Sequence, residues 1–160
     1  MPAHHSQDRE IERKYLLTGR PTRLDDANSV EIDQGYLPGA RINERVRRIK
    51  DARGAMTYFR TVKAGSGLER FEAEEETTIQ FFEAVWPLTR GARVRKRRYY
   101  VRDGDLRWEI DEFLDRPDLW LAEVELEHVD HAVAVPSWLA PCVVREVTLE
   151  KAFTNHALAK

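Results

Sequence analysis

The sequence has little of what several common kinds of protein require. A single cysteine, Cys142, in 160 residues excludes an intrachain disulfide and a zinc site made of cysteines. No apolar run approaches the roughly 20 residues of a membrane-spanning helix, and the first residues lack an apolar signal core. We therefore expect a cytoplasmic protein with no membrane partner.

Neither sign of charge is in excess. Lysine and arginine together number 26, and aspartate and glutamate 28, so the net charge is −2. Nucleic-acid-binding domains are usually basic, and we expect no nucleic-acid partner. The apolar fraction of 42% and the four tryptophans favour a folded core despite 34% charged residues. The length predicts one domain, residues 10–160, after a flexible tail at 1–9.

Charged residues recur at every second position of several segments. In the pentad at 10–14, Glu10, Glu12 and Lys14 would share one face of an extended strand. The same spacing returns along the chain, often with an apolar residue in the gap. A sheet that gathers acids and bases on one face suggests a site for a polyanion and its metal ions. The later pairs are Arg45/Arg47, Glu72/Glu74, Lys96/Arg98, Glu109/Asp111 and Glu123/Glu125.

Alternating segments predict a mainly β protein of the α+β class. Turn signals such as Pro38-Gly39 and Asp103-Gly104 separate many of these segments, and connections of hairpin length favour antiparallel pairing. The expected strands are 10–17, 30–37, 41–50, 56–63, 68–76, 94–102, 106–113 and 120–127, with a further short strand at 143–148 left open.

Helical spacing of apolar residues predicts a helix at 77–88, and shorter helices are expected at 131–139 and near the C-terminus through Leu158. Helices of this kind need apolar partners, which the uncharged strand faces provide. The charged faces then point to the interior. We infer an eight-stranded antiparallel barrel with a polar lumen and a few exterior helices.

The pentad at 10–14 resembles the ExExK signature of the CYTH superfamily, the triphosphate tunnel metalloenzymes. This pattern alone is weak in a charged chain, but further matches follow in the family's order over roughly residues 10–159. The resemblance looks closest to the short bacterial members that hydrolyse inorganic triphosphate, although those often carry Arg-Tyr where this chain has Ala152-Phe153. The further matches are Gln34–Leu37, Arg45–Arg47, Thr61–Lys63, Arg70–Glu74, Lys96–Tyr99, Trp108–Asp111, Leu121–Glu125 and Glu146–Lys151.

The resemblance implies an eight-stranded tunnel whose inward-pointing charges bind a triphosphate. Arginine offers a planar fork to two phosphate oxygens, whereas lysine offers a point charge. Both types are therefore expected along the phosphate chain. The predicted substrate-binding residues are Lys14, Arg45, Arg47, Lys63, Arg70, Lys96, Arg98 and Lys151.

Hard cations such as Mg²⁺ or Mn²⁺ prefer carboxylate, water and phosphate oxygens, and we expect two such ions. The predicted catalytic residues are Glu10, Glu12 and Lys96. A carboxylate among Glu10, Glu12 and Glu125 would orient the attacking water. The predicted metal ligands are Glu10, Glu12, Asp111, Glu123 and Glu125, with Glu72 and Glu74 as supporting carboxylates.

These residues predict an enzyme that hydrolyses the terminal phosphate of a triphosphate with the help of a metal. Inorganic tripolyphosphate, giving pyrophosphate and phosphate, is the first choice of substrate. No glycine-rich Walker loop is present in the sequence. Three alternatives stay open: a class IV adenylyl cyclase that makes cyclic AMP and pyrophosphate from ATP, a thiamine triphosphatase, and a non-catalytic polyphosphate- or nucleotide-binding module. The oligomeric state is open too, with a homodimer among the alternatives.

Overall fold

The computed structural model describes residues 6–39, 42–65 and 69–159; at 6–10 and 69–70 it describes the backbone but not the side chains. Nine strands make up about half of this part of the chain. Alternation explains them, because one face of each strand can pack on apolar partners while the other carries charge. The strands are β1 (Ser6–Leu17), β2 (Ser29–Tyr36), β3 (Asn43–Lys50), β4 (Met56–Ala64), β5 (Glu69–Thr77), β6 (Arg93–Asp103), β7 (Leu106–Phe113), β8 (Trp120–Glu125) and β9 (Val143–Glu146).

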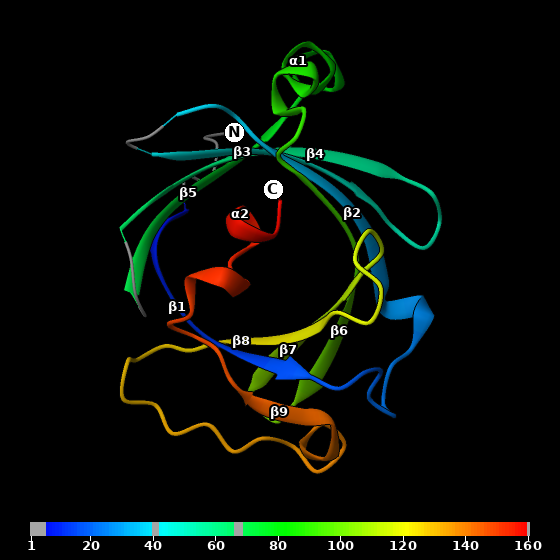
Figure 1. Cartoon of the computed structure of the whole chain (residues 1–160), viewed down its shortest axis with the longest axis vertical. Coiled ribbons are helices and arrows are strands. Elements are labelled where there is room, and N and C mark those ends of the chain that lie inside the picture. Colours follow the sequence, from blue (N-terminus) through cyan, green and yellow to red (C-terminus); the bar gives the residue numbers. More distant parts are fainter. Residues whose placement is uncertain (1–5, 40–41, 66–68, 160) are drawn as a thin grey trace.

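The strands form one sheet in the order β5-β4-β3-β2-β6-β7-β8-β1-β9, and the neighbours pair antiparallel. β1 changes partner along its length: residues 6–11 pair with β5, and residues 12–17 pair with β8. The sheet therefore curls around an interior (Figure 1). The predicted mainly β, antiparallel class is confirmed.

The prediction of an eight-stranded barrel is wrong in two respects. The sheet has nine strands, because residues 143–146 form β9 beside the end of β1. Among the described residues, no ladder closes the sheet over the full length of β1, since its pairing with β5 ends at Ile11. β1 also begins at Ser6, inside the stretch predicted as a flexible tail, and residues 1–5 lie outside the described part.

An apolar layer covers the outside of β1, β6, β7 and β8. Trp108 and Val124 are fully buried in it. Leu139, from the connection between β8 and β9, packs against the same cluster and is fully buried as well. The uncharged strand faces are therefore the outer ones, and the charged faces are left for the interior.

The short helix predicted at 131–139 is wrong. This stretch is irregular, and the 3-10 turn η3 (Ala140–Cys142) follows it. Pro136 explains the difference, because proline lacks the N–H and its ring clashes with the preceding turn of a helix. Another 3-10 turn, η1 (Asp26–Asn28), precedes β2.

The helix predicted at 77–88 is present as α1 (Ile79–Val85), which continues into the 3-10 turn η2 (Trp86–Thr89). The Thr78 side chain caps α1 by accepting a hydrogen bond from a backbone N–H of its first turn. α1 lies outside the sheet (Figure 1). Its Phe82 ring packs on an aromatic ring of β4. Within the described residues, no helix has the length and apolar character needed to cross a membrane.

The second helix, α2 (Asn155–Leu158), follows the 3-10 turn η4 (Lys151–Phe153) and lies inside the curve of the sheet (Figure 1). The prediction of exterior helices is therefore wrong for this segment. Leu158 and Ala159 pack on inward-facing apolar side chains such as Phe113. The C-terminal segment thus gives one end of the interior an apolar base.

Candidate active site

A cavity of about 880 Å³ lies between the sheet and the C-terminal segment. Each of β1 to β8 contributes side chains to its wall, because alternate residues of a strand point to the same side. Most of the predicted site residues meet here. Those on the wall are Glu12, Lys14, Arg45, Arg47, Lys63, Glu72, Glu74, Arg98, Glu123, Glu125 and Lys151.

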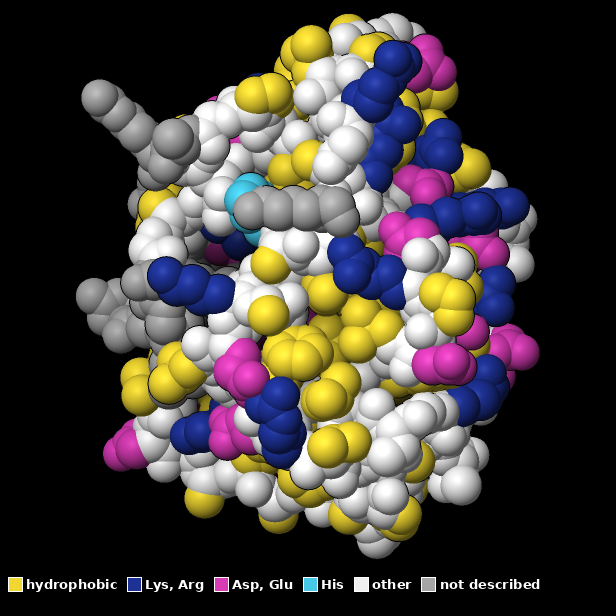
Figure 2. Space-filling view, viewed as in Figure 1, with side chains coloured by type: hydrophobic (Ala, Val, Ile, Leu, Met, Phe, Trp, Pro, Cys, Tyr) yellow, Lys and Arg dark blue, Asp and Glu magenta, His cyan; other side chains and the backbone are white. Residues whose placement is uncertain are grey.

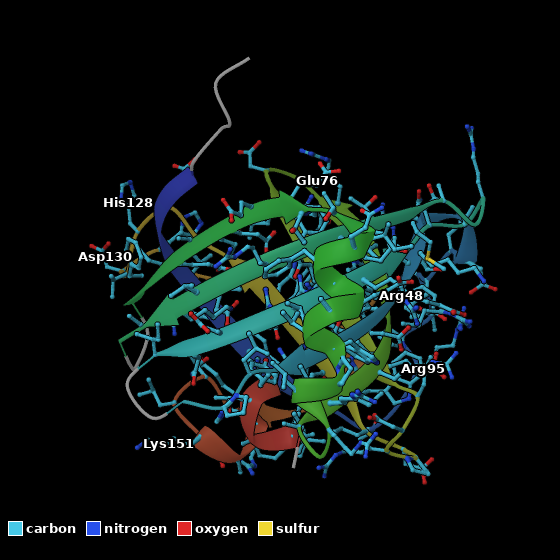
Figure 3. All side chains as sticks on the ribbon, turned by 90° about the horizontal axis from the view of Figure 1, so that it is seen from above. Arg48, Glu76, Arg95, His128, Asp130 and Lys151 are labelled. Atoms are coloured by element: carbon cyan, nitrogen blue, oxygen red, sulfur yellow. The ribbon has the colours of Figure 1, made fainter. Side chains whose placement is uncertain are left out.

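The other predicted site residues are placed differently or are not described. Lys96 and Asp111 are fully buried and lie behind the wall. The side chains of Glu10 and Arg70 lie outside the described part of the structure. Lys151 stands at the rim of the cavity, where its side chain is exposed and extends outward (Figure 3).

Asp111 binds basic groups rather than facing the cavity. The Nε and Nη2 atoms of Arg98 donate to its two carboxylate oxygens at 2.7 and 2.8 Å, and Lys96 Nζ donates to Oδ2 at 2.8 Å. Lys96 Nζ also donates to Oδ1 of Asn155 in α2 at 3.1 Å. In this arrangement Asp111 holds Arg98 in position, which differs from the metal-ligand role predicted for it.

Lys96 has an unusual proton affinity for a lysine. Burial, followed by the positive charge of Arg98, lowers the pKa of Lys96 to about 7, although Asp111 acts in the opposite direction. Burial raises the pKa of Asp111, but Arg98 and then Lys96 outweigh it, and the pKa is lowered. Asp111 therefore stays ionised at neutral pH, whereas Lys96 can gain or lose a proton there.

Two pairs of glutamates face each other across neighbouring strands of the wall. Glu12 lies opposite Glu125, and Glu109 lies opposite Glu123. Like charges directly opposite destabilise a sheet, and a divalent cation beside them would relieve the repulsion. This donor set fits a hard divalent cation.

Basic groups of the wall lie close to the Glu123 carboxylate. In the part of the chain that the structure describes, no three carboxylate, imidazole or thiol groups lie close enough together to hold a metal ion. Oε1 of Glu123 is 3.1 Å from Lys14 Nζ, and Oε2 is 3.8 Å from Arg98 Nη2. Burial raises the pKa of Glu123, but Lys14 and then Arg98 hold it well below its usual value. Metal binding by Glu123 therefore requires an exchange of cationic partners.

The side of the wall formed by β3, β4 and β5 carries its own ion pairs. Arg45 Nη2 lies 3.2 Å from Glu74 Oε2 and 3.7 Å from Glu72 Oε1. Lys63 Nζ lies 3.7 Å from the other oxygen of Glu72. Burial raises the pKa of Glu74, but Arg47 and then Arg45 outweigh it, and the pKa is lowered. Glu74 therefore stays ionised at neutral pH.

Several residues of the wall were given no catalytic, metal or substrate role from the sequence, although Glu109 stood among the alternating charged pairs. Glu109 had a signal, because it alternates with Asp111. Tyr36 had one too, since it lies two positions after Gln34 on the same strand face. Residues 154–157 had none, because a segment that enters the interior from one end leaves no alternating pattern in the sequence.

The curved antiparallel sheet and its cavity of mixed charge define a protein with a CYTH-type fold. No protein-family model matches the chain, but two enzymes do. An inorganic triphosphatase from Nitrosomonas europaea is 38% identical over 157 residues, which cover 94% of this chain and 96% of that protein. An inorganic triphosphatase from Acetivibrio thermocellus is 29% identical over 154 residues, which cover 95% of this chain and 94% of that protein.

Solved structures agree with this comparison. The crystal structure of an inorganic triphosphatase matches with a TM-score of 0.64 at 34% identity, covering 94% of this chain and 93% of that one. A conserved hypothetical protein from Pyrococcus furiosus, 17% identical with a TM-score of 0.52 over 81% of each chain, shares the fold alone. The chain belongs to the inorganic triphosphatase family of short CYTH-type proteins, which confirms the family predicted from the motifs.

Proposed function

We propose that this protein hydrolyses inorganic triphosphate to pyrophosphate and phosphate with the help of a divalent metal ion. The observation that carries the proposal is an interior cavity whose wall combines basic side chains on β3, β4 and β6 with opposed glutamates on β1, β7 and β8. Such a wall offers partners to both the phosphate chain and the metal. The names of both relatives support the same reaction.

The basic side chains of the wall would bind the phosphate oxygens. Arg45, Arg47 and Arg98 present N–H donors, and Lys14 and Lys63 add point charges. Phosphoryl transfer depends mainly on positioning and on stabilisation of charge, which these groups provide together. The proposed substrate-binding set remains Lys14, Arg45, Arg47, Lys63, Arg70, Lys96, Arg98 and Lys151.

Glutamates of the opposed pairs would hold the metal. Glu12, Glu123 and Glu125 lie on the wall, and Glu10 joins them through its place in the pentad. We propose Mg²⁺ or Mn²⁺, with two ions in the site. The metal, when bound, would stabilise the negative charge that develops on the leaving pyrophosphate and make water more acidic. A carboxylate among Glu10, Glu12 and Glu125 orients the attacking water, while Asp111 keeps Arg98 in place.

Lys96 completes the proposed catalytic set. Its ammonium lies behind Asn155, so a contact with substrate requires the Asn155 side chain to move. With its pKa lowered to about 7, Lys96 would supply a proton near neutral pH to the oxygen of the leaving pyrophosphate. With this pKa, Lys96 is only partly protonated at neutral pH, so it is a less constant positive charge than the arginines around it.

Phosphate release from tripolyphosphate, measured with purified protein and Mg²⁺ or Mn²⁺, tests the proposal. We expect one phosphate and one pyrophosphate from each tripolyphosphate, and no reaction in the presence of EDTA. ATP and thiamine triphosphate in the same assay distinguish the alternatives. Cyclic AMP from ATP would indicate a cyclase, and tight binding without turnover would indicate a binding module.

A single substitution separates the metal site from the fold. Glu12→Gln should lose turnover with either metal, because it removes a carboxylate charge from the opposed pair, while its circular dichroism spectrum stays that of the wild type. Wild-type turnover in Glu12→Gln at limiting metal would remove Glu12 from the ligand set. No phosphate release from any of the three triphosphates with either metal would reject the proposed reaction.

A further inference from the structure

Arg47 differs from the other basic side chains that the strands bring to the cavity wall. Among the described residues, no carboxylate lies within ion-pair distance of its guanidinium, whereas each of the others has one nearby. Arg47 is nevertheless buried. The other pairs are Arg98 with Glu109 at 2.8 Å, Lys14 with Glu123 at 3.1 Å, Arg45 with Glu74 at 3.2 Å and Lys63 with Glu72 at 3.7 Å.

Gln34 of β2 takes the position that a carboxylate holds for the other arginines. It lies directly opposite Arg47 across the β2–β3 ladder, and Nε and Nη2 of Arg47 donate to its Oε1 at 3.1 and 3.0 Å. A guanidinium has donors only, so the amide oxygen must face Arg47 and the amide nitrogen must face away. That nitrogen donates to the Tyr36 hydroxyl at 3.4 Å. Gln34 is fully buried, so its orientation is fixed by these two neighbours.

A neutral partner orients the Arg47 fork without cancelling its charge. A buried charge that lacks an opposite charge is unfavourable. Burial, followed by Arg45 and Arg98, lowers the pKa of Arg47 to about 10, although the more distant Glu74 acts in the opposite direction; Arg47 is still a cation at neutral pH. An anion in the cavity would supply the opposite charge in direct contact that Arg47 lacks. Arg47 would bind that anion without first giving up a carboxylate, unlike Arg45 or Arg98.

We propose that Gln34 is a positioning residue that makes Arg47 the first phosphate anchor of the cavity, and that the neutrality of its amide is essential to this role. The inference rests on the proposed function for the identity of the anion, a triphosphate. A glutamate at position 34 would keep both hydrogen bonds to Arg47 and cancel its charge. It has the shape of glutamine, and the Tyr36 hydroxyl can turn to donate to the second carboxylate oxygen.

Gln34→Glu tests the inference, with Gln80→Glu as the matched control. Gln80 is exposed on α1, and its substitution changes the net charge by the same amount. Gln34→Glu should raise the melting temperature of the ligand-free protein, because it pairs a buried guanidinium. It should also raise KM for tripolyphosphate about tenfold or more with little change in kcat, because the new carboxylate competes with phosphate. The control should change neither quantity.

A purely structural role for Gln34 would not make Gln34→Glu more stable and at the same time weaken its binding of substrate. A KM for Gln34→Glu equal to that of an active wild type would overturn the inference. Should this variant not fold, Gln34→Met removes the acceptor at similar size, and it should lower the melting temperature and raise KM together. A lower melting temperature with an unchanged KM in Gln34→Met would overturn the inference as well.

The failure of this inference can be told apart from a failure of the proposed function. A wild-type protein that releases no phosphate would reject the reaction. Calorimetric binding of tripolyphosphate in the presence of Ca²⁺ still compares Gln34→Glu with the wild type in that case. Weaker binding by Gln34→Glu than by Gln80→Glu supports the anchor role, and equal binding overturns it.

Discussion

Asp33 and Asp111 are each held by two basic side chains, but on opposite faces of the same sheet. Asp33 of β2 lies 2.8 Å from Arg48 and 3.6 Å from Arg95 on the outer face. Asp111 of β7 lies 2.7 Å from Arg98 and has a second cation at 2.8 Å on the inner side. The Asp33 side chain is 26% exposed and the Asp111 side chain 1%. Similar pairing thus occurs in very different surroundings.

The Asp33 and Asp111 clusters differ in burial rather than in the number of their ion pairs. Arg48 and Arg95 lie on the outer side of the molecule (Figure 3), and there basic and acidic side chains are interleaved over β2 and β6 (Figure 2). Water screens such charges, so each contributes little to stability. Inside the sheet, charges depend on one another and their pKa values shift, which is the condition for acting on a ligand.

The largest effect is expected from Asp111→Asn. The substitution keeps the size of the side chain but leaves Arg98 and Lys96 buried without their shared carboxylate. Breaking a buried ion pair from one side costs about 3–5 kcal/mol. Urea unfolding of the variant and the wild type measures the difference. A loss below about 1 kcal/mol would show that water reaches these charges and that the inner cluster behaves like the outer one.

The lowered pKa of Lys96 predicts that stability depends on pH through the inner cluster. Lys96 has a pKa of about 7 in the folded protein against 10.5 ordinarily, so between these values the unfolded chain binds more protons and rising pH favours the fold. The free energy of unfolding should therefore increase from about pH 7 to about pH 9, by at most about 1.4 kcal/mol per unit. Lys96→Met should remove this increase, and Arg95→Met on the outer face should leave it in place. A flat wild-type profile would contradict the lowered pKa.

The strands were predictable because charged and apolar residues alternate along them. In some strands, however, the sequence does not show which face points to the interior. β7 has the bounds that were predicted for it, residues 106–113. In β6, the run from Arg95 to Arg98 is basic at every position, so alternation alone does not tell which side chains face the interior. The spacing was assigned to Lys96 and Arg98, the family resemblance supported that choice, and the structure places both on the inner side.

The alternating pattern could not predict how deeply a side chain is buried, nor where the C-terminal segment lies. Alternation gives the face on which Asp111 lies, but whether a side chain lines the cavity or lies behind it depends on what covers it from inside. The cover includes Asn155 of α2, which reaches Lys96 across the interior. A contact between residues so far apart in the chain has no local signal, and no strand periodicity marks the segment that makes it.

A smaller effect is expected from Asn155→Ala. It removes the hydrogen bond from Lys96 Nζ, at a cost of about 1–2 kcal/mol. If the Asn155 side chain must move before Lys96 reaches the substrate, kcat should stay the same or rise while stability falls. Asn43→Ala is the matched control, because Asn43 lies on the cavity wall at a distant strand. A fall in kcat as large as that measured in parallel for Lys96→Met would instead make Asn155 part of the positioning of that lysine.

The smallest effect is expected from Asp33→Asn, below about 1 kcal/mol. The chemical change is the same as in Asp111→Asn, but water can solvate Arg48 and Arg95 once the carboxylate charge is gone. This small loss should shrink further at about 1 M salt, where the screening length falls to about 3 Å, whereas the loss in Asp111→Asn should persist. Urea unfolding of both variants at low and high salt makes the test. If Asp33→Asn and Asp111→Asn lost the same free energy of unfolding at both salt concentrations, burial would not be what distinguishes the two faces of the sheet.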